Sequence, residues 1–408
     1  MPRGAYLSFP GSRYVLPVLS AAAGFDTIRG REDSQILLLG CGAVGAVVAR
    51  HLAGSRLART IVAADMDLAR AKAVARTSPR KVRPLRLELT DRGAIEKAAR
   101  GSSLVINAAH PKFNLPIMDT ALEADADYLD LAGGGNEQLA LHGRWQRKGR
   151  TALLGMGEDP GLSNVFARHA ADALDEVTAV RIRDGETARS DVYPFVFLFS
   201  PEVFIEETLA PAVVFERGRW RKLPRFSGRE DFRFPLPVGT VPVYNVAHEE
   251  VETLPRFLGK RPRSVDFKLA LLPDVVRLLR WLSDAGWDDP EMRRSFLSLV
   301  PPPASLAGRI SGCAVILVEV TGRRDSAPVT QTTWAAMDHE RAARRHGTTG
   351  TAWLTGTGAA AGALLVLEHA VEPGVLVPEQ LRPDLVLARL KGRDVEVRHR
   401  VVRERVLS

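Results

Sequence analysis

Between residues 35 and 154 the chain alternates short apolar runs with stretches whose apolar residues recur at helical spacing. Apolar runs bounded by polar residues are typical of buried strands, and spacings of three and four are typical of amphipathic helices. Strands are expected at 35–39, 60–64, 82–87, 104–107, 128–131 and 151–154, and helices at 43–52, 68–76, 92–100, 115–123 and 136–147. This alternation predicts an α/β fold, a doubly wound parallel sheet covered by helices on both faces.

The pattern changes after Asp159-Pro160-Gly161. A helix is expected at 162–174, followed by longer extended runs at 177–183, 195–199, 213–215 and 315–321. Ser200-Pro201 predicts the start of a further helix, and Ala285-Gly286 predicts the end of another. We therefore expect a second, α+β domain with a mostly antiparallel sheet.

Near the C-terminus, Thr355-Gly356-Thr357-Gly358 precedes an Ala- and Leu-rich stretch at 359–371. This sequence predicts a buried helix with a glycine-rich start, which returns to pack on the first domain. The expected organisation is an N-terminal extension at 1–33, a first domain formed by 34–160 together with 350–385, and a second domain at 161–349.

The composition is that of an ordinary soluble globular protein, with 45% hydrophobic and 25% charged residues. No apolar run approaches the roughly 18 residues of a membrane span, so no membrane partner is expected. An apolar run at 14–24 follows Arg13, but Pro10-Gly11-Ser12 interrupts the region, which favours an extension over a secretion signal. The two cysteines, Cys41 and Cys313, provide no disulfide framework and favour a reducing, cytoplasmic location.

The formal net charge of +8 is shared by many nucleic-acid-binding proteins. Here, however, the basic residues are interleaved with 48 acidic ones, and basic clusters such as 217–222 are short. This distribution favours a solvated basic surface that attracts small anions. We expect a small-molecule substrate and no nucleic-acid partner.

A glycine-rich turn, Gly40-Cys41-Gly42-Ala43-Val44-Gly45, directly follows the first expected strand and opens the first expected helix. Asp65 ends the next strand, about 20 residues after Gly45, as the dinucleotide-binding fingerprint requires. A glycine turn that serves packing alone would not need this context. The sequence therefore predicts a Rossmann domain that binds a nicotinamide dinucleotide.

Each position of the turn has a physical role. Gly40 permits the tight turn, Gly42 lets the backbone approach the pyrophosphate, and Gly45 lets the helix pack closely on the strand. The exposed N–H groups at Ala43 and Val44, together with the helix dipole, then hold the pyrophosphate. Asp65 would accept hydrogen bonds from the adenosine ribose and repel the extra phosphate of NADP, so NAD is expected over NADP.

Two further regions resemble the saccharopine dehydrogenase-like family. They are the run at 104–118 that continues to Tyr128-Leu129-Asp130-Leu131-Ala132, and the segment Gly155-Met156-Gly157-Glu158-Asp159-Pro160-Gly161-Leu162-Ser163-Asn164. The C-terminal segments at 355–359 and 374–379 are similar to the closing helix and turn of the same family. His248 with Thr253-Leu254-Pro255 resembles the L-lysine 6-dehydrogenase branch, whereas the acidic pair Glu158-Asp159 departs from it.

The resemblance implies oxidation or reduction of a carbon–nitrogen bond in an amino acid or imine by an NAD(P)-dependent oxidoreductase. Saccharopine dehydrogenase or L-lysine 6-dehydrogenase activity is the first hypothesis. The alternatives are reductive condensation of the carboxynorspermidine or homospermidine type, which acts on a polyamine precursor, and a non-catalytic dinucleotide-binding protein. By the same resemblance we expect a homodimer formed through the substrate-binding domain at 161–349.

Three polar residues are candidates for proton transfer to or from the reacting nitrogen. Asp159 precedes a helix start, where it either handles the amine or caps the helix. Lys112 is a base if neighbouring cations lower its pKa, and otherwise binds a carboxylate or lies on the surface. His110 has a suitable intrinsic pKa but also fits a structural role. Asn107 and Ala108 are expected to contact the cofactor through the backbone.

Substrate carboxylates are best bound by arginine side chains, for which Arg183 and Arg225 are candidates. His248, followed by Glu249 and Glu250, either holds an ammonium group or lies in a solvated turn. Asp338-His339-Glu340 with His346 has a spacing that is more often a charged helix face than a metal site, so no metal is expected.

Overall fold

The computed structural model describes residues 34–403, and the extension at 1–33 lies outside the described residues. The first sheet is parallel and has seven strands in the order β16-β6-β5-β4-β1-β2-β3. Its strands are β1 (Ser34–Leu39), β2 (Ala58–Asp65), β3 (Val82–Arg86), β4 (Leu104–Asn107), β5 (Asp127–Asp130), β6 (Thr151–Leu153) and β16 (Gly374–Leu376). The helices between them are α1 (Ala43–Ala53), α2 (Leu68–Thr77), α3 (Arg92–Ala99), α4 (Asn114–Glu123), α5 (Asn136–Leu139) and α6 (His142–Arg147). The predicted doubly wound Rossmann sheet is confirmed.

The second sheet has ten strands, and its main path runs in the order β10-β9-β13-β7-β14-β15-β17. Those strands are β7 (Glu176–Asp184), β9 (Ala212–Glu216), β10 (Arg219–Leu223), β13 (Ser264–Ala270), β14 (Ser311–Arg324), β15 (Ala327–Asp338) and β17 (Val397–Arg403). Three short strands complete it: β8 (Thr187–Arg189), β11 (Glu230–Arg233) and β12 (Thr240–Asn245). All pairs are antiparallel except β7 with β13, so the expectation of a mostly antiparallel sheet is confirmed.

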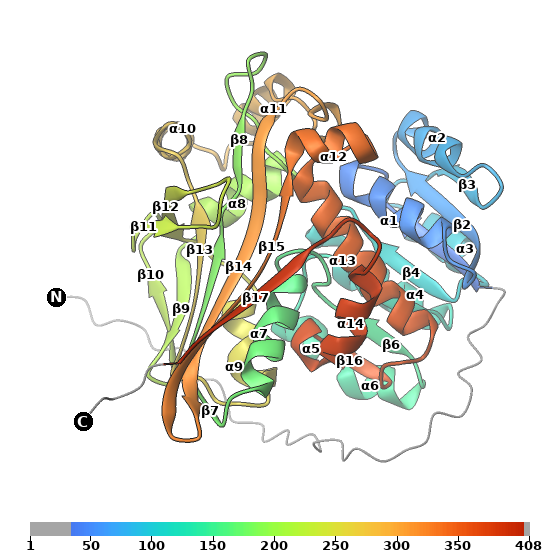
Figure 1. The fold of residues 1–408 in the computed structure, drawn as a ribbon. Coiled ribbons are helices and arrows are strands. Elements are labelled where there is room, and N and C mark those ends of the chain that lie inside the picture. Colours follow the sequence, from blue (N-terminus) through green and yellow to red (C-terminus); the bar gives the residue numbers. More distant parts are fainter. Residues whose placement is uncertain (1–33, 404–408) are drawn as a thin grey trace, which may run out of the picture.

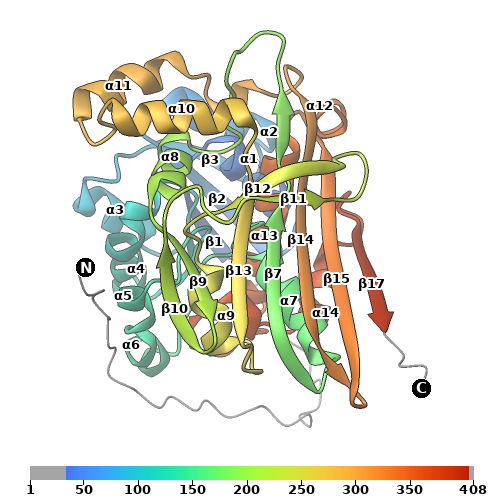
Figure 2. The same cartoon turned by 90° about the vertical axis from the view of Figure 1, so that its left-hand side faces the viewer.

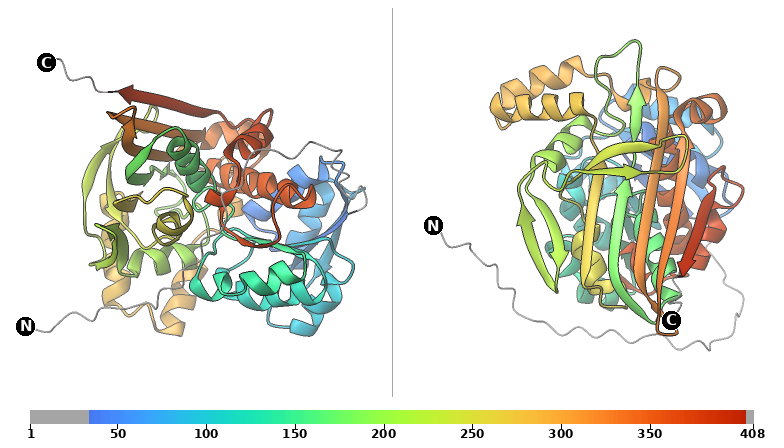
Figure 3. Two further views of the ribbon diagram at one scale, coloured as in Figure 1. Left: turned by 90° about the horizontal axis from the view of Figure 1, so that it is seen from below. Right: turned by 60° about the vertical axis from the view of Figure 1, so that its left-hand side comes forward.

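The remaining helices lie between the two sheets or on top of the second one (Figures 1 and 2). They are α7 (Leu162–Asp172), α8 (Pro201–Leu209), α9 (Glu250–Phe257), α10 (Pro273–Asp284), α11 (Pro290–Leu299), α12 (His339–His346), α13 (Gly350–Leu367) and α14 (Pro383–Leu390). Helix α7 packs against β14 and β15, and α13 packs against α1, β5 and β15. Seen from below in Figure 3, α7, α13 and α14 fill the space between the sheets.

Helix α13 is the centre of the molecule. It is apolar enough to cross a membrane by composition, but 94% of it is buried inside the protein, as expected of a core helix. The expectation that its glycines form the helix start is wrong, because Thr349 caps the helix by accepting a hydrogen bond from the backbone N–H of Ala352. Gly356 lies inside the helix instead, where an added Cβ would stand 2.6 Å from Cβ of Val47. Glycine there lets α13 approach α1 closely.

Other local expectations need correction as well. The single helix expected at 136–147 is split at Ala140 and Leu141 into α5 and α6. The strand expected at 195–199 is wrong, because this segment is irregular and leads into α8. Its Phe197 and Leu198 are buried without pairing to a strand, so the apolar run reflects burial alone. The cap predicted at Ser200 is confirmed, since its hydroxyl accepts a hydrogen bond from the N–H of Val203. The short strand β16 and the terminal strand β17 were not expected.

Candidate active site

The turn between β1 and α1 has the geometry that a pyrophosphate requires. Gly40 has a φ of +98°, and a Cβ on it would stand 2.6 Å from the carbonyl oxygen of Ala108. A Cβ on Gly45 would collide with the carbonyl oxygen of Gly40 at 2.1 Å. Around Gly42, in contrast, no atom lies within 4 Å of the Cβ position, so space remains for a ligand against the backbone. These three environments match the roles expected of the three glycines.

The start of α1 is free to receive an anion. Its N-cap residue, Gly42, offers no side-chain hydrogen bond, and the first turn, which includes Ala43 and Val44, has no acidic residue. The N–H groups of that turn and the helix dipole therefore remain available for phosphate oxygens. Asp65 borders the same turn, where its carboxylate accepts hydrogen bonds from the N–H of Cys41 at 2.8 Å and of Asp67 at 2.9 Å. The chain thus fits a dinucleotide.

A cavity of about 180 Å³ lies beside this turn, at the carboxyl ends of the parallel strands. Ligands of open α/β sheets bind at this edge. The Rossmann sheet contributes residues from the loops after β1, β4, β5 and β6, and the second sheet and α8 cover the other side. The principal lining residues are Val44, Asn107, Ala108, Asn114, Asp159, Asp184, Glu186, Val203, Glu207, His248, Phe267, Thr351 and Thr355.

The cavity wall is strongly acidic. Four carboxyl side chains line it, those of Asp159, Asp184, Glu186 and Glu207, and no lysine or arginine within 34–403 belongs to the lining. Burial is the largest cause that raises the pKa of each group, to about 6 for Asp184 and to about 8 for Glu207. The pKa values of Asp159 and Glu186 are raised well above their ordinary values by burial and then by neighbouring carboxylates. Ionised acids without compensating cations are costly in such a site.

Asp159 and Asp184 form the centre of this group. Burial raises both pKa values, and a hydrogen bond from the Asp159 carboxyl partly lowers that of Asp184. Two carboxyl groups in contact share a proton because both cannot ionise at low cost. The alternative reading of Asp159 as a helix cap is wrong, since Gly161 is the N-cap residue of α7 and its N–H donates to the side chain of Asn164 at 2.9 Å. Asp159 is available for chemistry.

Among the described residues that line the cavity, His248 is the one cationic side chain. Burial lowers its pKa, but the charge and hydrogen bond of Glu250, together with Glu249 and Glu207, outweigh this and raise it to about 10. Its Nδ1 bonds to the Glu250 carboxylate, whose other oxygen accepts a hydrogen bond of 2.7 Å from the hydroxyl of Ser163. His248 is therefore an imidazolium at neutral pH, fixed in orientation. The reading of His248 as part of a solvated turn is wrong, because its side chain is only 8% exposed.

Two of the predicted cofactor contacts also reach the cavity. The Asn107 side chain donates to the side-chain oxygen of Asn114 at 2.7 Å and accepts from the N–H of Ala109 at 3.0 Å, so it is held within the wall. The adjacent Ala108 carbonyl packs against Gly40. Both residues thus lie between the glycine turn and the acidic wall, where the expectation of a backbone contact to the cofactor stays a prediction.

Three predicted site residues lie elsewhere. Lys112 is exposed, with its Nζ 5.4 Å from the ring of Phe113, and does not line the cavity. Arg183 is 1% exposed and forms ion pairs with Glu230 at 3.2 Å and with Asp266 at 2.8 Å. It precedes Asp184 on β7, and successive strand residues point to opposite faces of a sheet, so it faces away from the cavity.

Arg225, the other arginine expected to bind a substrate carboxylate, is engaged on the surface. Its guanidinium donates to the hydroxyl of Ser283 at 2.6 Å, near the end of α10. It is absent from the cavity lining. The structure therefore brings neither predicted arginine to the cavity.

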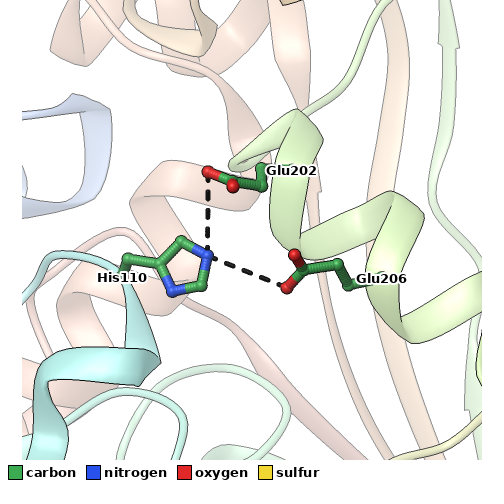
Figure 4. A group of neighbouring side chains, drawn as sticks. All are labelled: His110, Glu202 and Glu206. Atoms are coloured by element: carbon green, nitrogen blue, oxygen red, sulfur yellow. Dashed lines mark ion pairs between the residues drawn. The ribbon is translucent and has the colours of Figure 1, made fainter. Parts of the chain in front are cut away.

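His110 lies at the edge of the cavity, against two acids of α8 (Figure 4). Its Nε2 is 3.8 Å from carboxylate oxygens of both Glu202 and Glu206. Three such groups could hold a metal ion. However, Nδ1 of His110 accepts a hydrogen bond from the backbone N–H of Lys112, so in the neutral ring the proton is on Nε2 and no lone pair faces the acids. Arg293 also pairs with both glutamates, which reduces their attraction for a metal.

The other sequence cluster with metal-like spacing is dispersed in the structure. Asp338 caps α12 by accepting from the N–H of Arg341. His339 accepts from the N–H of Gly350 and contacts the carbonyl oxygen of Thr187, while His346 pairs with Asp394 at 2.9 Å. These side chains have separate structural partners.

Sequence reasoning missed Asp184, Glu186 and Glu207. Asp184 is the last residue of β7, and Glu186 lies in the loop that follows it. Two acids at the end of an expected strand were a local signal that could have indicated a site. Glu207 lies in α8 and has no local signal, because it is the packing of α8 over the Rossmann sheet edge that brings it to the cavity.

Comparison with known proteins identifies the family. The family description "Saccharopine dehydrogenase NADP binding domain" matches residues 36–153, and "Saccharopine dehydrogenase C-terminal domain" matches residues 157–395. Carboxyaminopropylagmatine dehydrogenase from Synechocystis sp. is 30% identical over 88% of this chain and 95% of the relative. Carboxynorspermidine synthase from Vibrio cholerae is 26% identical over 86% of this chain and 93% of the relative.

Solved structures show the same fold. Saccharopine dehydrogenase (L-Glu forming) from Saccharomyces cerevisiae superimposes with a TM-score of 0.69 at 17% identity, over 91% of this chain and 100% of that one. Homospermidine synthase from Legionella pneumophila, solved in complex with NAD, gives a TM-score of 0.68 at 16% identity, over 90% and 91% of the two chains. The chain therefore belongs to the saccharopine dehydrogenase family of dinucleotide-dependent oxidoreductases, as the sequence predicted.

Proposed function

We propose that this enzyme reductively couples a cationic amine of the polyamine type to an aldehyde, or runs the reverse oxidation. The observation that carries the proposal is the cavity wall, to which the part of the chain that the structure describes contributes four carboxyl groups and no lysine or arginine. A buried ammonium group would compensate those charges and be held by charge-assisted hydrogen bonds. The names of the two relatives, a carboxyaminopropylagmatine dehydrogenase and a carboxynorspermidine synthase, support the same substrate class.

The same wall supports oxidation of saccharopine or lysine less well. Those substrates carry carboxylates, which guanidinium groups bind best. Arg183 forms ion pairs with Glu230 and Asp266, and Arg225 lies on the surface. A substrate carboxylate entering the cavity would instead meet Asp159 and Asp184. The polyamine-type alternative considered from the sequence is therefore the better supported hypothesis.

In the coupling direction, the amine nitrogen attacks the aldehyde carbon and water leaves, which forms an imine. Hydride addition to the imine carbon and protonation of nitrogen then give a secondary amine. The bound dinucleotide supplies the hydride, and it receives one in the reverse reaction. Asp159 and Asp184, with one shared proton, can remove a proton from the attacking ammonium and return one to the product nitrogen. His248 keeps part of the wall neutral by pairing with Glu250.

We propose NAD as the preferred dinucleotide. Asp65 stands at the edge of the glycine turn as a fixed carboxylate that would repel a ribose phosphate. The cation nearest in sequence, Arg70, pairs with Asp67 at 3.5 Å on the surface and so does not offset this charge. We propose that 34–160 and 350–385 bind the dinucleotide and contribute Asp159 to the acidic wall. The part at 161–349 supplies Asp184, Glu186 and Glu207, and the surface through which two copies form a homodimer.

The experiment is a pair of assays on the purified enzyme. In one, loss of NADH or NADPH absorbance is followed with diamines and with aldehydes that either carry or lack a carboxylate. In the other, reduction of NAD or NADP is followed with lysine and saccharopine from pH 7 to about 10, a range that spans the ordinary lysine pKa. Amine-dependent NADH consumption without lysine or saccharopine oxidation supports the proposal. Oxidation of lysine or saccharopine without any coupling activity contradicts it.

We also propose that the protein works in the cytoplasm. Both cysteines, Cys41 and Cys313, are buried and unpaired, which suits a reducing compartment. Fractionation of the native host would test this location. Light scattering of the purified protein would test the homodimer, because a mass near twice 44.5 kDa is expected.

A further inference from the structure

A second, larger cavity adjoins the acidic one. Its volume is about 510 Å³, and it shares Glu186 and Leu269 with the first cavity. It lies between the segment after β8, the start of α10 and the side of α8, elements that meet at one end of the molecule (Figure 2). We call this second cavity the distal groove. The two cavities therefore adjoin at Glu186 and Leu269.

The walls of the distal groove are mainly apolar. The lining includes Phe197, Leu198, Phe204, Leu271 and Leu278. Phe197 packs edge-on against Phe204, with ring centroids 5.2 Å apart. Such walls suit methylene groups, because burying aliphatic carbon against them removes apolar surface from water. Aromatic faces and edges of this kind also accept the stem of a cationic chain.

The lining of the groove includes three acids. Glu186, which the two cavities share, accepts a hydrogen bond from the hydroxyl of Thr351. Asp191 and Asp274 also line the groove, and within 34–403 Arg189 is the one lysine or arginine among the lining residues. Asp274 pairs with Arg277 of its own helix. Asp191 makes no ion pair with any residue in 34–403 and is exposed, so it is free to meet a cation.

We propose that the distal groove binds the far arm of the amine substrate, with methylene groups along the apolar wall and a second cationic group at Asp191. This inference rests on the proposed function, because it takes the near end of the amine to be in the acidic cavity. It makes the enzyme selective for an amine with a second ammonium or guanidinium group over a monoamine of equal length. The observations that carry it are the shared lining residues, Glu186 and Leu269, and the acidic side chains within the mainly apolar lining of the second cavity.

The test is calorimetric binding to the full-length enzyme loaded with dinucleotide. The probes are butylamine, 1,4-diaminobutane and (4-aminobutyl)guanidine, which share a chain of four carbons and differ in the second cation. We expect both dications to bind about fivefold more tightly than butylamine, as one additional ion pair at an exposed carboxylate would give. The two dications distinguish whether the groove prefers ammonium or guanidinium.

Two variants locate the effect. Asp191→Asn should weaken dication binding about fivefold and leave butylamine unchanged, whereas Asp288→Asn, an equal charge change on an exposed residue outside the groove, should change neither. Ala188→Phe places a ring in the groove and should weaken the dications alone. Its unchanged butylamine affinity would show that the acidic cavity is still folded.

The outcomes separate the two proposals. Equal affinity of butylamine and the dications for the unaltered enzyme, or equal effects of Asp191→Asn and Asp288→Asn, overturns the groove. If the enzyme binds dications selectively but shows no amine-dependent NADH or NADPH consumption, the proposed reaction is contradicted. The proposed binding site would still stand. Coupling activity that does not depend on the second cation supports the reaction and overturns the groove.

Discussion

The imidazole of His248 lies flat on the ring of Phe267, with ring centroids 3.8 Å apart and ring planes inclined by 6°. This stacking and the bond from Nδ1 to Glu250 fix the ring in two directions. Nε2 is then the ring nitrogen that can meet a ligand in the cavity. A buried imidazolium held in this way partly compensates the acidic wall and leaves the remaining negative charge for a cationic substrate.

Glu250 should control the charge state of His248. Glu250→Gln removes the largest influence that raises the pKa of His248, so that pKa should fall from about 10 toward its ordinary value. An NMR titration of the ring measures it directly. Glu249→Gln is the matched control, because the Glu249 carboxylate is farther away, at 3.7 Å, and its removal should lower the pKa less. Equal His248 pKa values in the two variants would refute this role of Glu250.

Asp159 should be essential for turnover but not for dinucleotide binding. Asp159→Asn keeps the size of the side chain and removes its proton transfer, so kcat should fall by about 10²–10⁴-fold. The dissociation constant for NAD should stay the same, because the glycine turn is unaltered. The variant should be at least as stable as the original, since it removes a buried acid. Full activity in Asp159→Asn would exclude the proton-transfer role.

The cofactor preference should depend on the charge of Asp65. Asp65→Asn retains an acceptor for the N–H of Cys41 but loses the negative charge, so discrimination against NADP should relax about tenfold with a smaller loss of NAD affinity. Asp65→Ala also loses the acceptor and should weaken NAD binding itself. Calorimetric titration with both dinucleotides measures each effect. Unchanged NAD affinity in Asp65→Ala would show that the ribose contact lies elsewhere.

Stability should fall as the pH rises through the range in which Glu207 ionises. Burial raises the pKa of Glu207 from 4.5 to about 8. Its contribution to stability is therefore complete below about pH 4.5 and is lost as the pH approaches and passes 8. Glu207→Gln should match the original protein at about pH 4 and melt a few degrees higher at pH 9, because about 1 kcal/mol corresponds to roughly 2–4 °C in a domain of about 150–250 residues.

Thermal unfolding followed by circular dichroism checks this dependence. Glu137→Gln, on an exposed residue of α5, is the control and should leave the pH dependence unaltered. A saturating diamine should stabilise the original protein more at pH 9 than at pH 5, because the ionised wall binds the cation. A pH profile that is identical in Glu207→Gln and in the original protein would contradict the assignment.

The dinucleotide half of the site was predictable because its signals are local. The glycine turn, the strand before it and Asp65 lie within about 30 residues, and each requirement is a property of the backbone at one position. The strand and helix order of the Rossmann sheet follows from the same short-range periodicity. Helix α13 was predicted as buried, but its start was not, because glycines that serve close packing with Val47 look like a helix terminus in the sequence.

The substrate half was less predictable because it depends on contacts between distant segments. Asp184, Glu207 and His248 come from a strand, a helix and a loop. The pairing of β7 with β13 and β14 positions Asp184, and the packing of α8 brings Glu207 to the same cavity. Arg183 was expected to bind substrate, but strand alternation places Asp184 in the cavity wall and Arg183 on the other face. Only the register of the folded sheet decides which of two adjacent residues faces the substrate.

The most direct test of the acidic wall as an amine site is a crystal structure of the enzyme with NAD and a secondary amine product. The pyrophosphate should lie on the N–H groups at the start of α1, and the amine nitrogen should lie within about 2.6–3.2 Å of Asp159 or Asp184. A product whose carboxylate occupies that wall, or whose nitrogen is bound away from both aspartates, would contradict the proposed function.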